Sequence, residues 1–175
     1  MSTILYGSES WFTKDLRSAE SVYMRTAKEL LGVRQTTCNE IVLVELGTGD
    51  IKSVVRDKQR IFLQKLQDRP DYIGSYAEQV ITQAVQLHTP MGKIISELLQ
   101  IPVSNSFVKN FEVSVKNTIR TCAKTRYQTY CEVNSELDTG LMYTKEVSVP
   151  EYTRKAVTRL RLSSHRLKIE TGRWS

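Results

Sequence analysis

The sequence predicts an all-α protein, folded either as one multi-helix bundle or as two helical subdomains. Apolar residues recur at spacings of three and four along most of the chain, which is the period of an amphipathic helix. Capping residues, glycines and prolines stand between these periodic segments and mark helix ends. The 175 residues, 40% of them hydrophobic and 25% charged, are enough for one core or for two small ones.

Three helices are predicted in the N-terminal part of the chain. The first runs from Leu16 to Gly32, because glycine readily adopts the left-handed conformation that ends a helix. A short helix follows over residues 40–46. Asp50 can cap a third helix, which ends before Pro70. The residues expected to face the core from the first and third helices are Leu16, Ala19, Tyr23, Ala27, Leu30, Ile51, Val54, Val55, Phe62 and Leu66.

Two shorter helices are predicted next. Ser75 can cap one that runs to about residue 88, and Thr89 followed by Pro90 is a typical start for the other, which ends before Pro102. The core side of the second helix is expected to carry Met91, Ile94, Ile95, Leu98 and Leu99.

The longest predicted helix covers residues 106–131. Its core side is expected to carry Val108, Phe111, Val115, Ile119 and Cys122. On its opposite side, three cations and an aromatic ring recur at helical spacing and form one exposed stripe. Such a stripe can follow a phosphate backbone, although an ordinary solvated helix face carries cations at the same spacing. The stripe consists of Lys116, Arg120, Lys124 and Tyr127.

A loop and a basic C-terminal segment complete the chain. Residues 134–149 contain a turn at Asp138-Thr-Gly140 and side chains suited to strands, so a short hairpin can form there. A helix then starts after Pro150, with Tyr152, Ala156 and Leu160, and Leu167 as a further candidate, expected to face inward and the arginines outward. Residues 151–175 carry +5 of the net charge of +6. Their basic residues are Arg154, Lys155, Arg159, Arg161, Arg166, Lys168 and Arg173.

Together these patterns predict four consecutive regions: helical regions at residues 1–70 and 71–133, a linker at residues 134–150, and the basic segment at residues 151–175. Concentrated positive charge favours polyanionic partners, because phosphate contacts release counterions. The three cysteines are too widely spaced for a disulfide framework or a zinc site. No signal peptide or membrane span is predicted, so we expect a cytoplasmic or nuclear location.

Nothing in the sequence predicts catalysis, a metal site or a cofactor site. The aspartates are scattered among predicted helix ends and faces, with no adjacent pair to hold two divalent metals. Gly47-Thr-Gly-Asp50 lacks the further glycine and the lysine of a phosphate-binding loop, so we interpret it as a turn and a cap. His88 and His165 are expected to have structural roles. We therefore expect no independent enzymatic activity.

A series of motifs in fixed order carries a family resemblance. The first is Leu5-Tyr-Gly-Ser-Glu-Ser-Trp11, and Leu30-Leu-Gly-Val-Arg34 and Val44-Glu-Leu-Gly47 come next. The C-terminal ones are Arg161-Leu-Ser-Ser-His165 and Ile169-Glu-Thr-Gly-Arg-Trp174. The order resembles the region that follows the catalytic palm in reverse transcriptases of non-LTR (LINE-type) retrotransposons. Further matching positions are Thr36, Thr37, Asn39, Gln59, Phe62, Leu63, Lys65 and Leu66.

The resemblance implies that the N-terminal helices belong to a thumb, which closes over the template-primer duplex, and that the rest is a connection region. The family's palm carboxylates are absent, and the chain stops before the family's zinc-binding segment. We therefore expect sequence-independent binding of RNA, DNA or their hybrid through the stripe and the basic segment.

Two other interpretations remain open. The chain can be a helical protein-interaction module whose basic segment docks on an acidic partner, or the product of a decayed reading frame without a function of its own. A thumb separated from its palm also loses a packing surface. We therefore expect an exposed apolar patch at Ile4, Leu5, Trp11 and Phe12, which would favour self-association.

Overall fold

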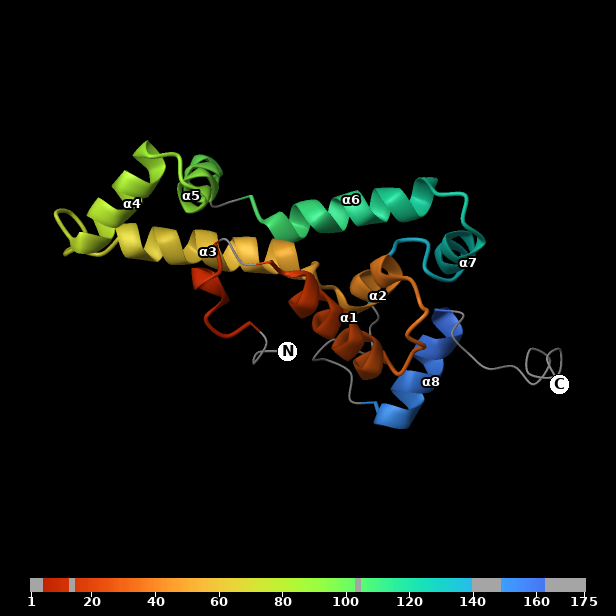
Figure 1. Ribbon diagram of the computed structural model, residues 1–175. Coiled ribbons are helices and arrows are strands. Elements are labelled where there is room, and N and C mark those ends of the chain that lie inside the picture. Colours follow the sequence, from red (N-terminus) through yellow and green to blue (C-terminus); the bar gives the residue numbers. More distant parts are fainter. Residues whose placement is uncertain (1–4, 13–14, 103–104, 140–148, 163–175) are drawn as a thin grey trace. The chain divides into compact units, whose positions relative to one another are not determined.

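The computed structural model describes residues 5–12, 15–102, 105–139 and 149–162 (Figure 1). Over these residues the fold is all-α and contains no strand, which confirms the predicted class. A 3-10 turn, η1 (Ser8–Ser10), precedes the helices. They are α1 (Arg17–Leu31), α2 (Asn39–Leu46), α3 (Ile51–Gln67), α4 (Tyr76–Gln86), α5 (Pro90–Gln100), α6 (Phe107–Thr121), α7 (Thr125–Val133) and α8 (Glu151–Arg161).

Capping side chains start three of the helices, as the sequence predicts. The carboxylate of Asp50 accepts a hydrogen bond from the amide of Ser53 (3.0 Å) at the start of α3. Ser75 Oγ accepts one from the amide of Glu78 (3.1 Å) at the start of α4. Thr89 caps α5 in the same way, with Pro90 at its first position. Each cap satisfies an amide that has no partner within its own helix.

Two glycines end helices in the way the sequence predicts. Gly32 follows α1 with φ of 68°, and Gly47 follows α2 with φ of 61°. In each case the glycine and the next residue donate hydrogen bonds back into the last turn, as Val33 does to the carbonyl of Lys28 (3.0 Å). Only glycine adopts this left-handed conformation without strain, so the two positions fix where the helices stop.

The long helix predicted for residues 106–131 is wrong, because the chain breaks into α6 and α7. Lys124 has an extended backbone (φ −65°, ψ 123°) and stands at the N-cap position of α7. No glycine or proline marks the break. It places the rings of Tyr127 and Tyr130 in the core, where both are buried. The gain from burying two large aromatic rings outweighs the continuity of the helix.

The described part of the predicted hairpin region contains turns. Asn134 Oδ1 accepts a hydrogen bond from the amide of Asp138 (3.1 Å), and its amide group donates to the Asp138 carbonyl (2.9 Å). Residues 140–148, where the strands of a hairpin were expected, lie outside the described residues.

The chain forms two compact units that alternate along the sequence. Unit 1 comprises residues 1–20 and 49–111, and unit 2 comprises residues 21–48 and 112–175. The division differs from the four consecutive regions expected from the sequence. Two helices, α1 and α6, begin in unit 1 and end in unit 2.

The core of unit 1 lies where α3 and the pair of helices α4 and α5 meet. Leu63, Ile95 and Leu98 are buried at its centre, and Phe12, Ile81, Val85, Met91, Ile94 and Phe107 pack around them. Gly92 lets α5 approach α4 closely, because a Cβ atom at this position would overlap the carbonyl group of Ala84. The expectation that Phe62 and Leu99 face the core is wrong, since both are exposed.

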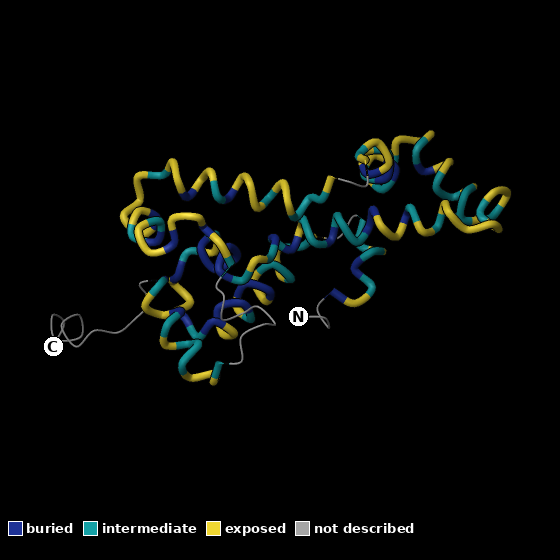
Figure 2. The backbone as a smooth tube through the Cα atoms, turned by 180° about the vertical axis from the view of Figure 1, so that it is seen from behind, coloured by how far each residue is buried: buried dark blue, intermediate teal, exposed yellow. Residues whose placement is uncertain are grey.

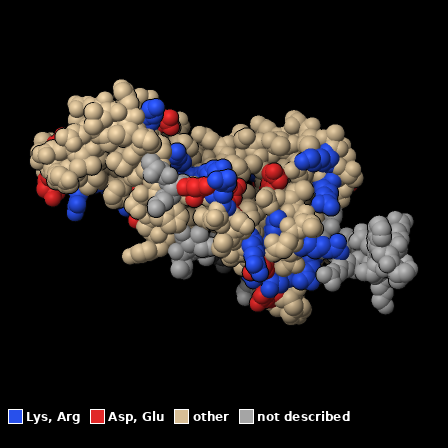
Figure 3. All heavy atoms as spheres, in the orientation of Figure 1, with Lys and Arg blue, Asp and Glu red and all other residues tan. Residues whose placement is uncertain are grey.

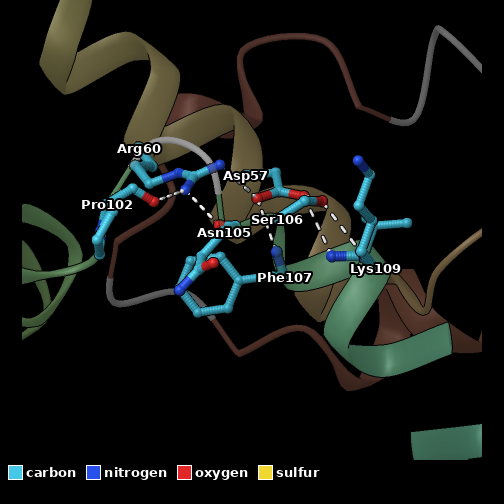
Figure 4. Close-up of polar contacts among 8 residues, drawn as sticks. Asp57, Arg60, Pro102, Asn105, Ser106, Phe107 and Lys109 are labelled. Atoms are coloured by element: carbon cyan, nitrogen blue, oxygen red, sulfur yellow. Dashed lines mark hydrogen bonds and ion pairs between the residues drawn. The ribbon is translucent and has the colours of Figure 1, made fainter. Parts of the chain in front are cut away.

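Asp57 joins α3 to the start of α6 in unit 1 (Figure 4). Its carboxylate accepts hydrogen bonds from Ser106 Oγ (2.6 Å) and from the amides of Phe107 (3.0 Å) and Val108 (3.1 Å). Arg60, one turn further along α3, pairs with the same carboxylate at 3.1 Å. Its guanidinium also donates to the carbonyls of Pro102 and Asn105. An acidic side chain from another helix therefore caps α6.

Unit 2 is built around α2. Ile41, Val42, Leu43, Val44 and Glu45 are all buried, so this helix is covered on every side (Figure 2). The largest fully buried side chains packed in the same unit are Tyr23, Leu31, Ile119, Tyr130 and Leu137. Leu30, expected to face the core from α1, is exposed. A helix whose residues are buried on all sides belongs in the middle of a core.

The N-terminal apolar segment is not the open patch that the sequence predicts. Leu5 is buried, and Trp11 and Phe12 are half-buried in unit 1. Lys58 Nζ donates to the Leu5 carbonyl (2.9 Å), which attaches the segment to α3. Ile4 lies outside the described residues. Among the described large apolar side chains of the segment only Tyr6 is largely exposed, so they give no support to self-association through it.

Candidate nucleic-acid interface

Positive charge is concentrated in unit 2. The sequence of this unit holds 15 of the 25 basic residues and 10 of the 19 acidic ones, so it carries +5 of the net charge of +6. Figure 3 shows blue side chains gathered over α7 and α8, with a few red ones among those of α8. Unit 1 is nearly neutral by the same count. Unit 2 is therefore the part to which a polyanion would be drawn.

The predicted stripe of four residues is not one surface. The break before α7 separates Lys116 and Arg120 from Lys124 and Tyr127. Lys116 is only partly exposed and pairs with Glu112 (2.8 Å), while Arg120 is exposed near the end of α6. The prediction of one continuous cationic stripe is therefore wrong.

Tyr127 is not available to stack on a base. Its side chain lies in the core, with 3% of its surface exposed. Burial, followed by the nearby charge of Glu40, raises its pKa to about 12. Lys124 Nζ lies over the ring, 5.5 Å from its centre, in a cation–π contact. Of this pair only Lys124 is open to solvent.

The helix α8 faces the core with the opposite side from the one predicted. Tyr152 and Leu160, expected inside, are 78% and 62% exposed, and Ala156 is exposed as well. Thr158 and Leu162 are buried instead. The arginines therefore do not all point outward.

Arg161 shows why the helix is turned this way. Its Nη2 donates to Glu45 Oε2 (3.1 Å), and its Nε lies 3.1 Å from Glu45 Oε1. The Glu45 side chain is 1% exposed and also accepts a hydrogen bond from Tyr130 OH (2.9 Å). A buried carboxylate needs a cationic partner, and α8 supplies it.

The other basic residues of α8 are partly engaged within the unit. Arg159 Nε donates to the Gly32 carbonyl (2.6 Å), although its side chain is exposed. Lys155 pairs with Glu151, and its methylenes lie against Gly32. Arg154 is half-buried. The remaining predicted residues, Arg166, Lys168 and Arg173, lie outside the described residues.

Two exposed arginines that were not predicted as binding residues lie together in unit 2. Arg34 comes from the loop between α1 and α2, and Arg126 comes from the first turn of α7. Both line one hollow. Arg126 does not share the helical spacing of Lys116, Arg120, Lys124 and Tyr127, so the predicted stripe did not include it. A loop residue such as Arg34 has no periodicity to indicate a role.

The part of the chain that the structure describes contains no cluster suited to a metal ion. Over those residues, no three His, Cys, Asp or Glu side chains gather in a way that could hold a metal ion. Cys38, Cys122 and Cys131 are free and partly buried. No helix in the described ranges is both long and apolar enough to cross a membrane.

Comparison with known proteins gives no relative. No protein-family model, no curated protein and no solved structure matches this chain.

Proposed function

We propose that this chain is the thumb and connection portion of a non-LTR retrotransposon reverse transcriptase, and that it binds template-primer nucleic acid without sequence preference. In this proposal it catalyses no reaction itself, because the carboxylates for polymerase chemistry belong to a palm domain that this sequence lacks. The ordered motifs from Leu5 to Trp174 support the family.

The observation that carries the binding function is the charge of unit 2. Its net charge is +5, and the side chains of Arg34, Arg120, Lys124 and Arg126 are exposed there. These cations come from a loop and two helices, so they form a surface for a phosphate backbone rather than a pocket for a base edge. Binding of this kind does not depend on sequence.

The test is the salt dependence of binding to a fluorescently labelled RNA–DNA hybrid, measured by anisotropy with the full chain. With about five phosphates neutralised, log affinity should fall against log salt with a slope near −4. Hybrids of scrambled sequence should bind equally well. A slope near zero would contradict the proposal.

Two double variants, one in each unit, test whether the nucleic acid binds to unit 2. Arg120→Gln with Lys124→Gln removes two exposed cations of unit 2 and should make the slope shallower by about 2. Lys65→Gln with Lys93→Gln removes two exposed cations of unit 1 and should leave it unchanged. Equal effects of the two pairs would mean that unit 2 is not the binding surface.

A helical protein-interaction module remains the second candidate, and the outer face of α8 favours it. Tyr152 and Leu160 lie two turns apart on this face and are both largely exposed. Exposed apolar residues at helical spacing are typical of protein contacts. A chain of this kind would show no salt-dependent binding of the hybrid. Under the first proposal, replacing both residues with serine leaves hybrid binding unchanged.

A further inference from the structure

Three basic side chains from three helices hold the loop between α1 and α2. Lys28 Nζ donates to the Gln35 carbonyl (2.7 Å), and Arg126 Nη1 donates to the Thr36 carbonyl (3.2 Å). Arg159 holds the Gly32 carbonyl at the start of the same loop. The loop is thus fixed at three carbonyls by residues from α1, α7 and α8.

A turn within the loop fixes the backbone at Arg34. The amide of Thr37 donates to the Arg34 carbonyl (3.0 Å), which closes a four-residue turn. Since the carbonyls of Gln35 and Thr36 are bonded to Lys28 and Arg126, the backbone of this turn is held in one arrangement. Arg34 therefore extends from a fixed point.

A hollow of about 50 Å³ lies beside this loop. Arg34 lines it from the loop and Arg126 from α7. One water molecule needs roughly 10–15 Å³ by this measure, so the hollow has room for several waters or for one phosphate group. No acidic side chain is among its lining residues in the described part of the chain. They are Arg34, Thr36, Thr37, Cys38, Ile41, Arg126 and Leu162.

The chemistry of this lining suits a tetrahedral oxyanion. Each guanidinium has five N–H donors, so Arg126 keeps donors for a ligand after it has bonded to the Thr36 carbonyl. Two guanidinium groups from different elements can hold oxygens on two sides of one phosphorus. The first turn of α2 begins at Asn39, next to the lining residue Cys38, but Glu40 in the same turn offsets the positive end of the helix dipole, so the two guanidinium groups supply the positive charge of the site.

We infer that this hollow binds one phosphate group of a nucleic-acid backbone between Arg34 and Arg126. The inference rests on the proposed function and adds to it a specific site. No aromatic side chain lines the hollow, so nothing in its described lining would stack a base and favour a free nucleotide. The exposed Lys124, two residues before Arg126, provides a contact for a neighbouring phosphate of the same strand.

The first experiment measures hybrid binding by Arg34→Gln and Arg126→Gln variants of the full chain. Each should weaken binding about tenfold, as expected for a lost charge-assisted hydrogen bond, and each should make the salt slope shallower by about 1. The matched control is Arg25→Gln. Arg25 is an exposed arginine of the same unit that pairs with Glu29 and does not line the hollow. It should change affinity by less than about twofold.

Arg126 also supports the loop, so weaker binding by its variant could result from a disturbed loop. A second set of measurements separates this effect from the loss of a phosphate contact. Arg126→Lys keeps the charge but loses the paired donors, so it should bind more weakly than wild type and more tightly than Arg126→Gln. In amide NMR spectra of the wild-type chain, inorganic phosphate should shift residues 36–41 with a saturating dependence. Chloride at equal ionic strength should not, and Arg34→Gln should lose the phosphate effect.

The outcomes separate this site from the proposed function. If the Arg34 and Arg126 variants bind the hybrid as Arg25→Gln does while the steep salt slope remains, the site is overturned and the proposed function stands. If the wild-type chain shows no salt-dependent hybrid binding, the proposed function is overturned. Phosphate-induced shifts at residues 36–41 in that case would overturn the assignment of the site to a nucleic-acid backbone.

Discussion

Glu45 and Arg161, which are 116 residues apart in the sequence, form an ion pair that attaches α8 to the centre of unit 2. The carboxylate is buried, whereas the guanidinium is about one quarter exposed. Burial raises the pKa of Glu45 above its usual value, and the charge of Arg161 and the hydrogen bond from Tyr130 act in the opposite direction. The charged form of Glu45 is therefore stabilised in the core only while Arg161 is present.

Replacing Arg161 with methionine should lower the free energy of unfolding by about 3 kcal/mol at pH 7, because it leaves a buried carboxylate unpaired. The pKa of Glu45 should then rise further. A group whose pKa is raised by folding loses its stabilising contribution as pH rises through the folded-state value. The variant should therefore be less destabilised at pH 5 than at pH 7. Urea denaturation at both pH values measures this.

The control for this prediction is the double variant Arg161→Met with Glu45→Gln. It has no buried charge at this position, so its stability should depend less on pH than that of the single variant. An Arg161→Met protein that is equally destabilised at both pH values would contradict the assigned role of Glu45.

The cap on α6 leads to a second prediction. Asp57→Ala removes the acceptor for Ser106 Oγ and for two backbone amides, and leaves Arg60 without its carboxylate. We expect a loss of about 2–3 kcal/mol, since a buried charged pair and a helix cap are lost together. Asp57→Asn keeps one acceptor oxygen and should lose less. Chemical denaturation gives both values, and equal losses would mean that the charge, not the cap, dominates.

Gly92 provides a third prediction. Alanine is the better helix former by about 1 kcal/mol, which alone would stabilise α5. Its Cβ atom would overlap the backbone carbonyl of Ala84, so α4 and α5 must move apart. Overpacking of this kind costs about 1–3 kcal/mol, so we expect a net loss of stability in thermal unfolding. Ser96→Ala on the same helix adds no atom, so it creates no overlap and serves as the control. If Gly92→Ala is instead more stable than wild type, the two helices can move apart without cost.

A fourth prediction concerns Tyr127. Its pKa is raised from 10.0 to about 12, chiefly by burial. Its ionisation therefore favours the unfolded chain, and stability should be lost as pH rises above 10. In an ultraviolet titration of the folded protein, Tyr127→Phe should remove a tyrosine that ionises late. Loss of an early-ionising component instead would place this ring in contact with water.

Local signals predicted most of the helices correctly. Asp50, Ser75 and the pair Thr89 and Pro90 start helices because their side chains and ring act on the adjacent turn, and Gly32 ends one for an equally local reason. Such features need no knowledge of the rest of the fold. The predicted ends of these helices accordingly agree with the structure.

The break before α7 and the orientation of α8 could not be predicted in this way. Periodicity places Tyr152 and Leu160 on one face, but the face that turns inward is decided by Glu45, a residue of α2. Likewise, the hydrogen bond from Tyr130 to Glu45 is a long-range contact that a pattern along one helix does not contain. Arg34 and Arg126 were missed for the same reason, since only the fold brings them together.

Because the two units alternate along the chain, the parts of unit 2 leave the ribosome at different times during synthesis. Residues 21–48, which include the largely buried α2, are synthesised before residues 49–111, and residues 112–162, which supply α7 and α8, come later still. Until then α2 lacks side chains that cover it in the folded unit, among them Arg161, the partner of the buried Glu45 carboxylate. The core of unit 2 can therefore close only after residues 112–162 have left the ribosome, and chaperones would protect α2 most during the interval before that.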